Sequence, residues 1–240
     1  MLSDDYKQVL ENHAARAGSA VAAVGVPDLA RFMRVAQIEL ELLRLEGLTP
    51  SSALLDFGCG SGRLALVAIP YLASGSYLGV DISKTMIGHA IDLNEATLAR
   101  SEPGRYRFEI DDGGNLRRFG LEFDVVCAYS VFTQMEHEDT LRCLRQFASV
   151  LKPGGKVVCS VLNIESQLAK LTLLGEAEIA PDQRWKRLRT VTTSYGIMEA
   201  VAELAGFDNF RWYRGEEFKV QLGDGAREGL RQSVLVAERM

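Results

Sequence analysis

The sequence has few histidines, no long apolar run and no excess of positive charge. Its three histidines are His13, His89 and His137. No 18 apolar residues follow one another without interruption, so we expect no membrane-spanning helix and no membrane partner. The 27 lysines and arginines stand against 32 acidic residues, which gives a net charge of -5. General binding to nucleic acid needs a basic surface that displaces counterions, so this charge disfavours a nucleic-acid partner.

Cysteine is also scarce, and none of the four cysteines belongs to a CxxC pair. Cys59, Cys127, Cys143 and Cys159 stand in apolar or helical stretches, which predicts small buried thiols in a reducing cytoplasm. The N-terminal stretch is acidic and has no long apolar segment of the kind found in secretory signals, which favours the same location. No set of His, Asp and Asn has the spacing of metal ligands, so we expect no metal.

A length of 240 residues suits one domain with a sizeable core. Short apolar strands alternate with helices from residue 52 to residue 163, which predicts βαβ units and therefore an α/β, doubly wound, mostly parallel sheet. Two late strands, 208–214 and 232–239, have no helix between them and predict a hairpin at the sheet edge, with one strand antiparallel. We expect an N-terminal helical cap over 1–49, a core over 50–162, an inserted lid or substrate element over 163–192, and a C-terminal helix and hairpin over 193–240.

Three glycines, Gly58, Gly60 and Gly62, follow a short apolar run in LLDFGCGSGRLAL. A strand that leads through glycines into a helix brings backbone N–H groups and the positive end of a helix dipole to a ligand. The GxGxG spacing differs from the GxGxxG of dinucleotide sites, and no Lys-Ser or Lys-Thr pair follows as in a phosphate loop. Asp56 precedes the glycines, where a carboxylate would oppose phosphates and favour a cationic ligand.

Further acidic residues follow the next two strands. Asp81 ends the second strand and is placed to accept both hydroxyls of a ribose. In FEIDDGGNL, Asp111 or Asp112 would accept a hydrogen bond from an adenine amino group, or would serve only the turn before the glycines. The expected ligand is an adenosine joined to a cationic, amino-acid-like group.

The motifs LLDFGCGSGRL, YLGVDIS, FEIDDGGNL, FDVVCAYSVFTQM and LKPGGKVV resemble, in this order, those of the class I S-adenosylmethionine-dependent methyltransferases. The resemblance implies S-adenosyl-L-methionine as cofactor and a Rossmann-like, seven-stranded sheet whose last strand is antiparallel. It also implies that the glycines pass the methionine part, Asp81 holds the ribose and Asp112 flanks the adenine. The residues expected to bind the cofactor are Asp56, Gly58, Cys59, Gly60, Gly62, Asp81, Ile82, Met86, Asp112, Gly113, Tyr129 and Ser130.

Methyl transfer from a sulfonium is an in-line displacement, so an enzyme mainly has to align the acceptor and exclude water. A hydroxyl acceptor benefits from a general base. His137, just past the fourth strand, and Tyr129, at its end, are the catalytic candidates; the alternatives are a solvated loop histidine and a packed tyrosine. We expect no catalytic role for His89 or His13.

The sequence indicates the methyl acceptor less directly than it indicates the cofactor. SVFTQM resembles the SVFTH of small-molecule methyltransferases from saccharide and natural-product pathways, with Gln134 in place of the histidine. The basic stretch RWKRLR, residues 184–189, would suit an anionic or carrier-linked substrate, or would form a solvated helix face.

A small-molecule acceptor with O-methylation is favoured. The alternatives are a protein or RNA methyltransferase and a non-catalytic cofactor-binding scaffold; a nicotinamide-dependent dehydrogenase fails on the glycine spacing. No oligomeric state is indicated.

Overall fold

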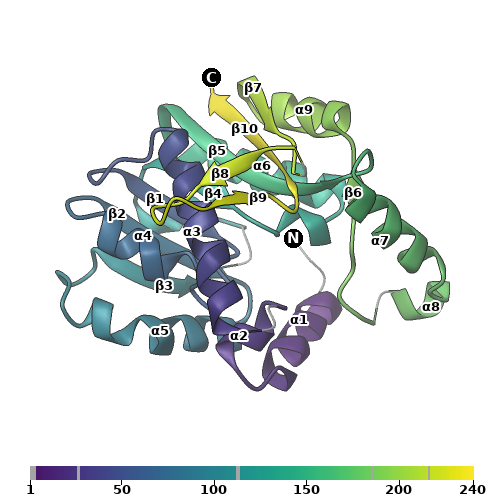
Figure 1. Ribbon diagram of the computed structural model, residues 1–240, viewed down its shortest axis with the longest axis horizontal. Coiled ribbons are helices and arrows are strands. Elements are labelled where there is room, and N and C mark those ends of the chain that lie inside the picture. Colours follow the sequence, from purple (N-terminus) through teal and green to yellow (C-terminus); the bar gives the residue numbers. More distant parts are fainter. Residues whose placement is uncertain (1–3, 26–27, 112–113, 185, 216) are drawn as a thin grey trace.

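The structure, a computed structural model, describes residues 4–25, 28–111, 114–184, 186–215 and 217–240. Its main sheet has the order β3-β2-β1-β4-β5-β10-β7, with the short β6 paired to the end of β5 (Figure 1). The strands along this order are β3 (Tyr106–Ile110), β2 (Ser76–Asp81), β1 (Ala53–Phe57), β4 (Phe123–Ala128), β5 (Leu151–Asn163), β10 (Ser233–Arg239) and β7 (Phe207–Tyr213), and β6 is Thr192–Thr193.

Neighbouring strands from β3 to β5 pair in parallel, whereas β10 pairs antiparallel with both β5 and β7. The last strand of the chain is therefore the antiparallel one, and the predicted seven-stranded, doubly wound sheet is confirmed. The fold class explains the apolar character of β1, in which four of five residues are buried, because a parallel sheet is covered on both faces.

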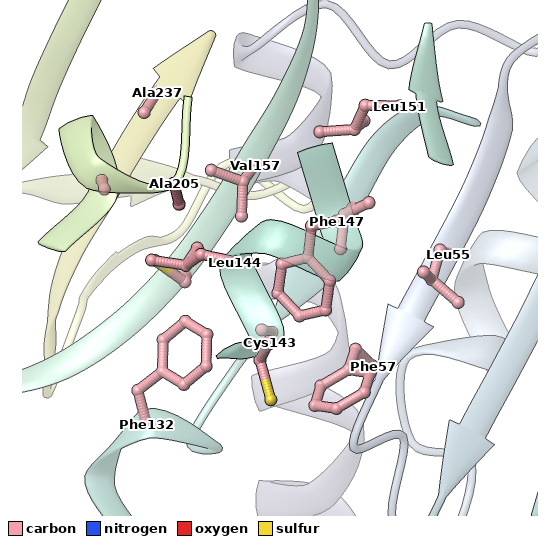
Figure 2. Packing of buried hydrophobic residues seen from close by; sticks show 14 of the residues in the cluster. Leu55, Phe57, Phe132, Cys143, Leu144, Phe147, Leu151, Val157, Ala205 and Ala237 are labelled. Carbon is pink, nitrogen blue, oxygen red and sulfur yellow. The ribbon is translucent and has the colours of Figure 1, made fainter. Parts of the chain in front are cut away.

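Two apolar cores cover the two faces of the sheet. One joins the sheet to α3 (Leu29–Leu45), α4 (Ala65–Tyr71) and α5 (Lys84–Leu98), and the other joins it to α6 (His137–Val150) and α9 (Tyr195–Leu204). In the second core, Phe147 of α6 packs edge-on against Phe57 at the end of β1, with ring centroids 4.9 Å apart (Figure 2). This contact fixes the end of β1, from which the glycine loop departs.

Two helix boundaries follow the signals in the sequence. Asp28 caps α3 by accepting a hydrogen bond from the Arg31 N–H, as expected of an N-cap aspartate. Pro70 lies in the last turn of α4, which ends one residue later, as expected of a residue without a backbone donor. β5 begins at Leu151 rather than at the predicted Gly155, because Leu151 already pairs with Phe123 of β4.

The two late strands pair with each other, but they are not joined by a simple turn. Between them, β8 (Lys219–Gln221) and β9 (Arg227–Gly229) form a separate two-stranded antiparallel sheet. Val220, Leu222 and Leu230 of this region are buried in the core of the α3 face. The short strands therefore extend the core rather than the main sheet.

The N-terminal segment and the predicted insert form helices outside the sheet. α1 (Asp4–Arg16) and α2 (Ala20–Ala23) lie below the sheet in Figure 1, whereas α7 (Gln167–Ala177) and α8 (Pro181–Arg184) project at the right. Across the described part of the chain, no helix has both the length and the apolar character needed to cross a membrane.

Candidate functional site

A cavity of about 400 Å³ lies between the ends of β1, β2 and β4 and the helices α1 and α2. This volume is within the range of small-ligand pockets, and its position matches the rule that open α/β sheets bind ligands at the carboxyl ends of their strands. Its walls are formed by Tyr6, Leu10, His13, Ala23, Val24, Gly25, Phe57, Gly58, Cys59, Gly60, Arg63, Asp81, Ile82, Ser83, Met86, Asp111, Tyr129, Ser130, Val131, Gln134, Met135 and Leu188.

The three motif glycines all have left-handed backbone conformations, with φ between 54° and 78°. A Cβ on Gly58 would lie 2.4 Å from a methyl of Val131, and a Cβ on Gly62 would lie 2.7 Å from the Asn94 amide. Gly58 and Gly60 line the cavity, whereas Gly62 packs against α5 and is not among the lining residues. At Gly58 and Gly62, the absence of a side chain lets protein segments pack closely as well as letting a ligand approach.

The N–H groups of the glycine loop are bonded within the protein. The N–H groups of Gly58 and Cys59 donate to the Val80 carbonyl, that of Gly60 donates to Asp81 and that of Gly62 to the Cys59 carbonyl. The expectation that these groups point at a ligand is therefore wrong at these four positions. The loop instead shapes the cavity floor and ties β1 to the end of β2.

Asp81 lies at the end of β2 and lines the cavity. One of its carboxylate oxygens accepts from the Gly60 N–H at 3.0 Å and the other from the Ser83 N–H at 2.8 Å. Burial raises the pKa of the Asp81 carboxyl, and these backbone N–H bonds oppose the rise. Each oxygen keeps lone pairs for a further donor, so the pair is suited to two vicinal hydroxyls.

Asp56 lies under the loop and not in the cavity wall. It is 5% exposed, and its carboxylate accepts a hydrogen bond of 2.6 Å from the Tyr77 hydroxyl. Burial raises the pKa of Asp56 to about 7, although the bond from Tyr77 opposes this. The structure thus places Asp56 in a supporting position rather than among the lining residues.

A buried ion pair stands at the same end of the cavity. Arg63, which follows the glycine loop, donates through Nε and Nη2 to the carboxylate of Glu39 on α3. Glu39 is 2% exposed, so the two charges neutralise each other in a region of low polarity. Burial raises the pKa of the neighbouring Tyr129 phenol above its ordinary value, and the Glu39 charge adds to this. Tyr129 therefore stays protonated at neutral pH.

Helix α1 closes the cavity and is held to α5 by Glu11. The Glu11 carboxylate accepts from the Ser83 hydroxyl at 2.5 Å and from both the N–H and the hydroxyl of Thr85. Burial raises the pKa of Glu11, but these hydrogen bonds outweigh it and the pKa lies below its usual value. Because the Ser83 N–H also bonds Asp81, α1 is connected through Ser83 to the proposed ribose-binding group.

The same helix contacts the segment that follows α8. The Arg189 N–H donates to the Tyr6 hydroxyl, and its guanidinium lies 4.1 Å from the centre of the Tyr6 ring. Arg189 also pairs with Glu136 at 3.3 Å, and Leu188 lines the cavity. The insert and the N-terminal helix thus meet over the site.

The histidines are arranged differently from the prediction. His137 is the first residue of α6, its Nε2 lies 3.0 Å from the Thr193 hydroxyl, and it is not among the residues that line the cavity. His13 on α1 does line the cavity. A helical cap over 1–49 is expected from the sequence, but no local spacing indicates that His13 would face the cavity, because the position of α1 depends on contacts of Glu11 and Tyr6.

The other predicted residues fall into three groups. Cys59, Ile82, Met86, Tyr129 and Ser130 line the cavity with Asp81. Asp112, Gly113 and Trp185 lie outside the described residues. Asp111, the alternative to Asp112, lines the cavity and pairs with Arg118 at 2.9 Å. The sequence did not predict that Leu10, His13, Val24 and Leu188 line the cavity. None of these residues belongs to a recognisable motif, and single apolar or polar residues carry no spacing signal.

Residues 55–157 match the family model described as a methyltransferase domain. The probable methyltransferase ltbC of Aspergillus luteorubrus is 33% identical over 107 residues, which make up 42% of this chain and 37% of that protein. An O-methyltransferase of Pyrenophora dematioidea is 29% identical over 121 residues, or 50% of this chain and 43% of that protein. Each alignment spans less than half of the relative's length.

The similarity in fold to a solved structure extends over nearly the whole chain. The crystal structure of magnesium protoporphyrin IX methyltransferase from Synechocystis, with bound SAH, has a TM-score of 0.65 and 20% identity. The similarity covers 99% of this chain and 97% of that one. At this level of identity the comparison shows the shared Rossmann-like fold.

Proposed function

Because this chain belongs to the class I S-adenosylmethionine-dependent methyltransferases, we propose that it transfers a methyl group to a small-molecule acceptor, preferably to an oxygen atom. The observation that carries this proposal is the cavity that joins the glycine loop, Asp81 and α1 at the ends of the parallel strands. The relative named as an O-methyltransferase supports oxygen as the methylated atom.

The residues of the cavity fit the cofactor. Asp81 offers two buried carboxylate oxygens to a ribose, Asp111 lies near the next strand end for the adenine, and the left-handed Gly58 and Gly60 keep the floor free of side chains. When bound, S-adenosylmethionine supplies an electrophilic methyl group on a sulfonium. The chain's own part is to align the acceptor and to exclude water.

Apolar side chains cover the part of the cavity that faces α1 and the insert. Leu10, Met135 and Leu188 line it, and Tyr6 is 4% exposed. Such a wall desolvates the reacting atoms and suits an acceptor with an apolar body. We propose that α1 and residues 163–192 form the lid and the acceptor side of the site.

The base for a hydroxyl acceptor is assigned to a histidine. Tyr129 stays protonated and would act as a hydrogen-bond donor rather than as a base. His13 lines the cavity, whereas His137 bonds Thr193 outside it. We propose His13 as the first candidate and keep His137 as the second. Replacing each with Gln in turn, with His89→Gln as control, should lower the rate for hydroxyl acceptors only at the true base.

The basic stretch gives little support to a carrier-linked substrate. Lys186, Arg187 and Arg189 each have an acidic partner, Asp182 at 3.8 Å, Glu176 at 3.5 Å and Glu136 at 3.3 Å. Their charge is matched within the chain, which favours a free small molecule. Cys59, Cys127, Cys143 and Cys159 are all buried and unpaired, which supports the cytoplasm as the proposed location.

A methyl-transfer assay tests the proposal. The protein is incubated with S-adenosylmethionine carrying a radiolabelled methyl group and with a panel of phenols, sugars and amines. We expect label on an oxygen of one small molecule, and loss of that label with Asp81→Asn. Transfer to a protein or RNA fraction, and to no small molecule, would contradict the proposal.

A further inference from the structure

Ser130 has an unusual conformation at the cavity wall. Its φ is +62°, in the left-handed region, and asparagine 209 is the other non-glycine residue with positive φ in the described ranges. A serine in this region costs about 1–2 kcal/mol unless its surroundings fix it. Three groups fix it here: its N–H donates to Ser160, its carbonyl accepts from Thr133, and its hydroxyl contacts Gln232.

The contacts form a ring whose direction can be deduced. The Ser130 N–H can only donate, so the Ser160 hydroxyl, 2.6 Å away, accepts there. The Ser160 oxygen lies 2.5 Å from Gln232 Oε1, a distance typical of O–H···O and too short for an N–H donor, so Ser160 donates to Gln232. The Gln232 amide nitrogen then donates to the Ser130 oxygen at 2.9 Å.

This direction leaves the Ser130 hydroxyl proton with the longest bond of the ring, which a stronger acceptor can replace. Its contact within the ring, to Gln232 Oε1, is longer, at 3.2 Å, and that oxygen already accepts from Ser160. Ser130 lines the cavity, and the next residue, Val131, packs directly on Gly58. The proton can therefore be donated to a stronger acceptor bound beside the first motif glycine.

A carboxylate bound beside the glycine loop would need hydrogen-bond donors, and several of those nearby are already engaged. The methionine part of the cofactor carries a carboxylate, yet the N–H groups of Gly58, Cys59, Gly60 and Gly62 are already bonded within the protein. The Arg63 guanidinium is paired with the buried Glu39 through two of its nitrogens. These four backbone N–H groups and two of the arginine nitrogens are thus engaged within the protein.

We propose that the Ser130 hydroxyl donates a hydrogen bond to the carboxylate of the methionine part of the cofactor, and that Ser160 and Gln232 are positioning residues that orient it. The inference rests on the proposed function. It brings the C-terminal end of the chain into the cofactor site, because Gln232 immediately precedes β10 and lies 102 residues from Ser130.

Two substitutions remove the donor in different ways. Ser130→Gly deletes the hydroxyl and tolerates the positive φ. Gln232→Glu keeps the shape of the side chain but has no N–H to donate. Its carboxylate would accept a hydrogen bond from the Ser130 hydroxyl, which reverses the bond between the two side chains and engages the hydroxyl proton. Gln146→Glu on α6 is the matched control, because the Gln146 side-chain oxygen accepts from the Leu116 N–H and Gln146 does not line the cavity.

Calorimetry with two adenosine thioethers at pH 8 is the test. S-adenosylhomocysteine carries the carboxylate, and 5′-methylthioadenosine lacks the amino-acid part. We expect Ser130→Gly and Gln232→Glu each to weaken S-adenosylhomocysteine binding about tenfold or more, as for a lost bond to a charged group. Methylthioadenosine binding should change less than about twofold, and Gln146→Glu should change neither.

Equal losses for both ligands, or no loss for either, would overturn the inference. If Gln232→Glu does not fold, Ser130→Gly decides alone. Failure of the unaltered protein to bind S-adenosylhomocysteine would instead count against the proposed function, so the two failures are distinguishable.

Discussion

The Tyr77 hydroxyl donates a 2.6 Å hydrogen bond to the Asp56 carboxylate beneath the glycine loop. This buried pair links Tyr77, near the start of β2, to Asp56, near the end of β1, and burial raises the pKa of Asp56 to about 7. Because the ordinary value for aspartate is about 3.9, the folded protein holds a proton between about pH 4 and pH 7 that the unfolded chain has lost. Stability should therefore fall as the pH rises through this window.

Asp56→Asn should remove this pH dependence. The amide oxygen still accepts the Tyr77 bond, but the side chain has no proton to lose. We expect the free energy of unfolding of the unaltered protein, measured by urea titration, to fall by about 3 kcal/mol more than that of the variant between pH 4.5 and pH 8. Parallel pH profiles for the two proteins would show that Asp56 titrates normally.

The proposed ribose contact predicts a loss of cofactor affinity in Asp81→Asn. An amide keeps one acceptor oxygen and turns the other into a donor, so one N–H bond and one ribose bond are lost. S-adenosylhomocysteine should bind at least about tenfold more weakly in calorimetry. Asp92→Asn on the exposed side of α5 is the control and should bind normally. Unchanged affinity in Asp81→Asn would refute the ribose role.

The close packing at Gly58 predicts a cost in stability. Gly58→Ala puts a Cβ 2.4 Å from Val131 and forces alanine into φ +70°, so unfolding should become easier by about 2 kcal/mol or more. Gly88→Ala, inside α5 and with open space around it, should instead stabilise the protein by up to about 1 kcal/mol. Equal effects in urea unfolding would contradict the packing argument.

The bonds of Glu11 predict that α1 governs ligand release. Glu11→Gln loses the charge that strengthens its bonds to Ser83 and Thr85, so α1 should open more often. In stopped-flow measurements S-adenosylhomocysteine should dissociate roughly three- to tenfold faster, with little change in association. Glu95→Gln, exposed on α5, should leave both rates unchanged. An altered association rate alone would argue against a closing role for α1.

Local patterns predicted most of the sheet. The alternation of strands and helices, the Asp28 cap and the position of Asp81 follow from periodicity and motif spacing, which act within a few residues. β8 and β9 were not predicted, because three-residue strands carry no periodic signal. Their place depends on packing of Val220 and Leu230 into a distant core.

The site was predicted only in part, because some of its contacts join residues that are distant in the sequence. Gly58, Asp81 and Ser130 stand in motifs and line the cavity, whereas Gln232 reaches Ser130 from 102 residues away. Asp56 has the motif position but is directed to Tyr77. Side-chain direction and long-range pairing depend on the folded structure, and neither can be read from spacing alone.

Calorimetry of the unaltered protein with S-adenosylhomocysteine and, separately, with NAD tests the cofactor assignment most directly. The glycine spacing, Asp81 and the cavity predict one binding site for S-adenosylhomocysteine with a dissociation constant in the micromolar range or below, and no binding of NAD. Tight binding of NAD, together with no binding of S-adenosylhomocysteine, would contradict the assignment of the cavity to S-adenosylmethionine.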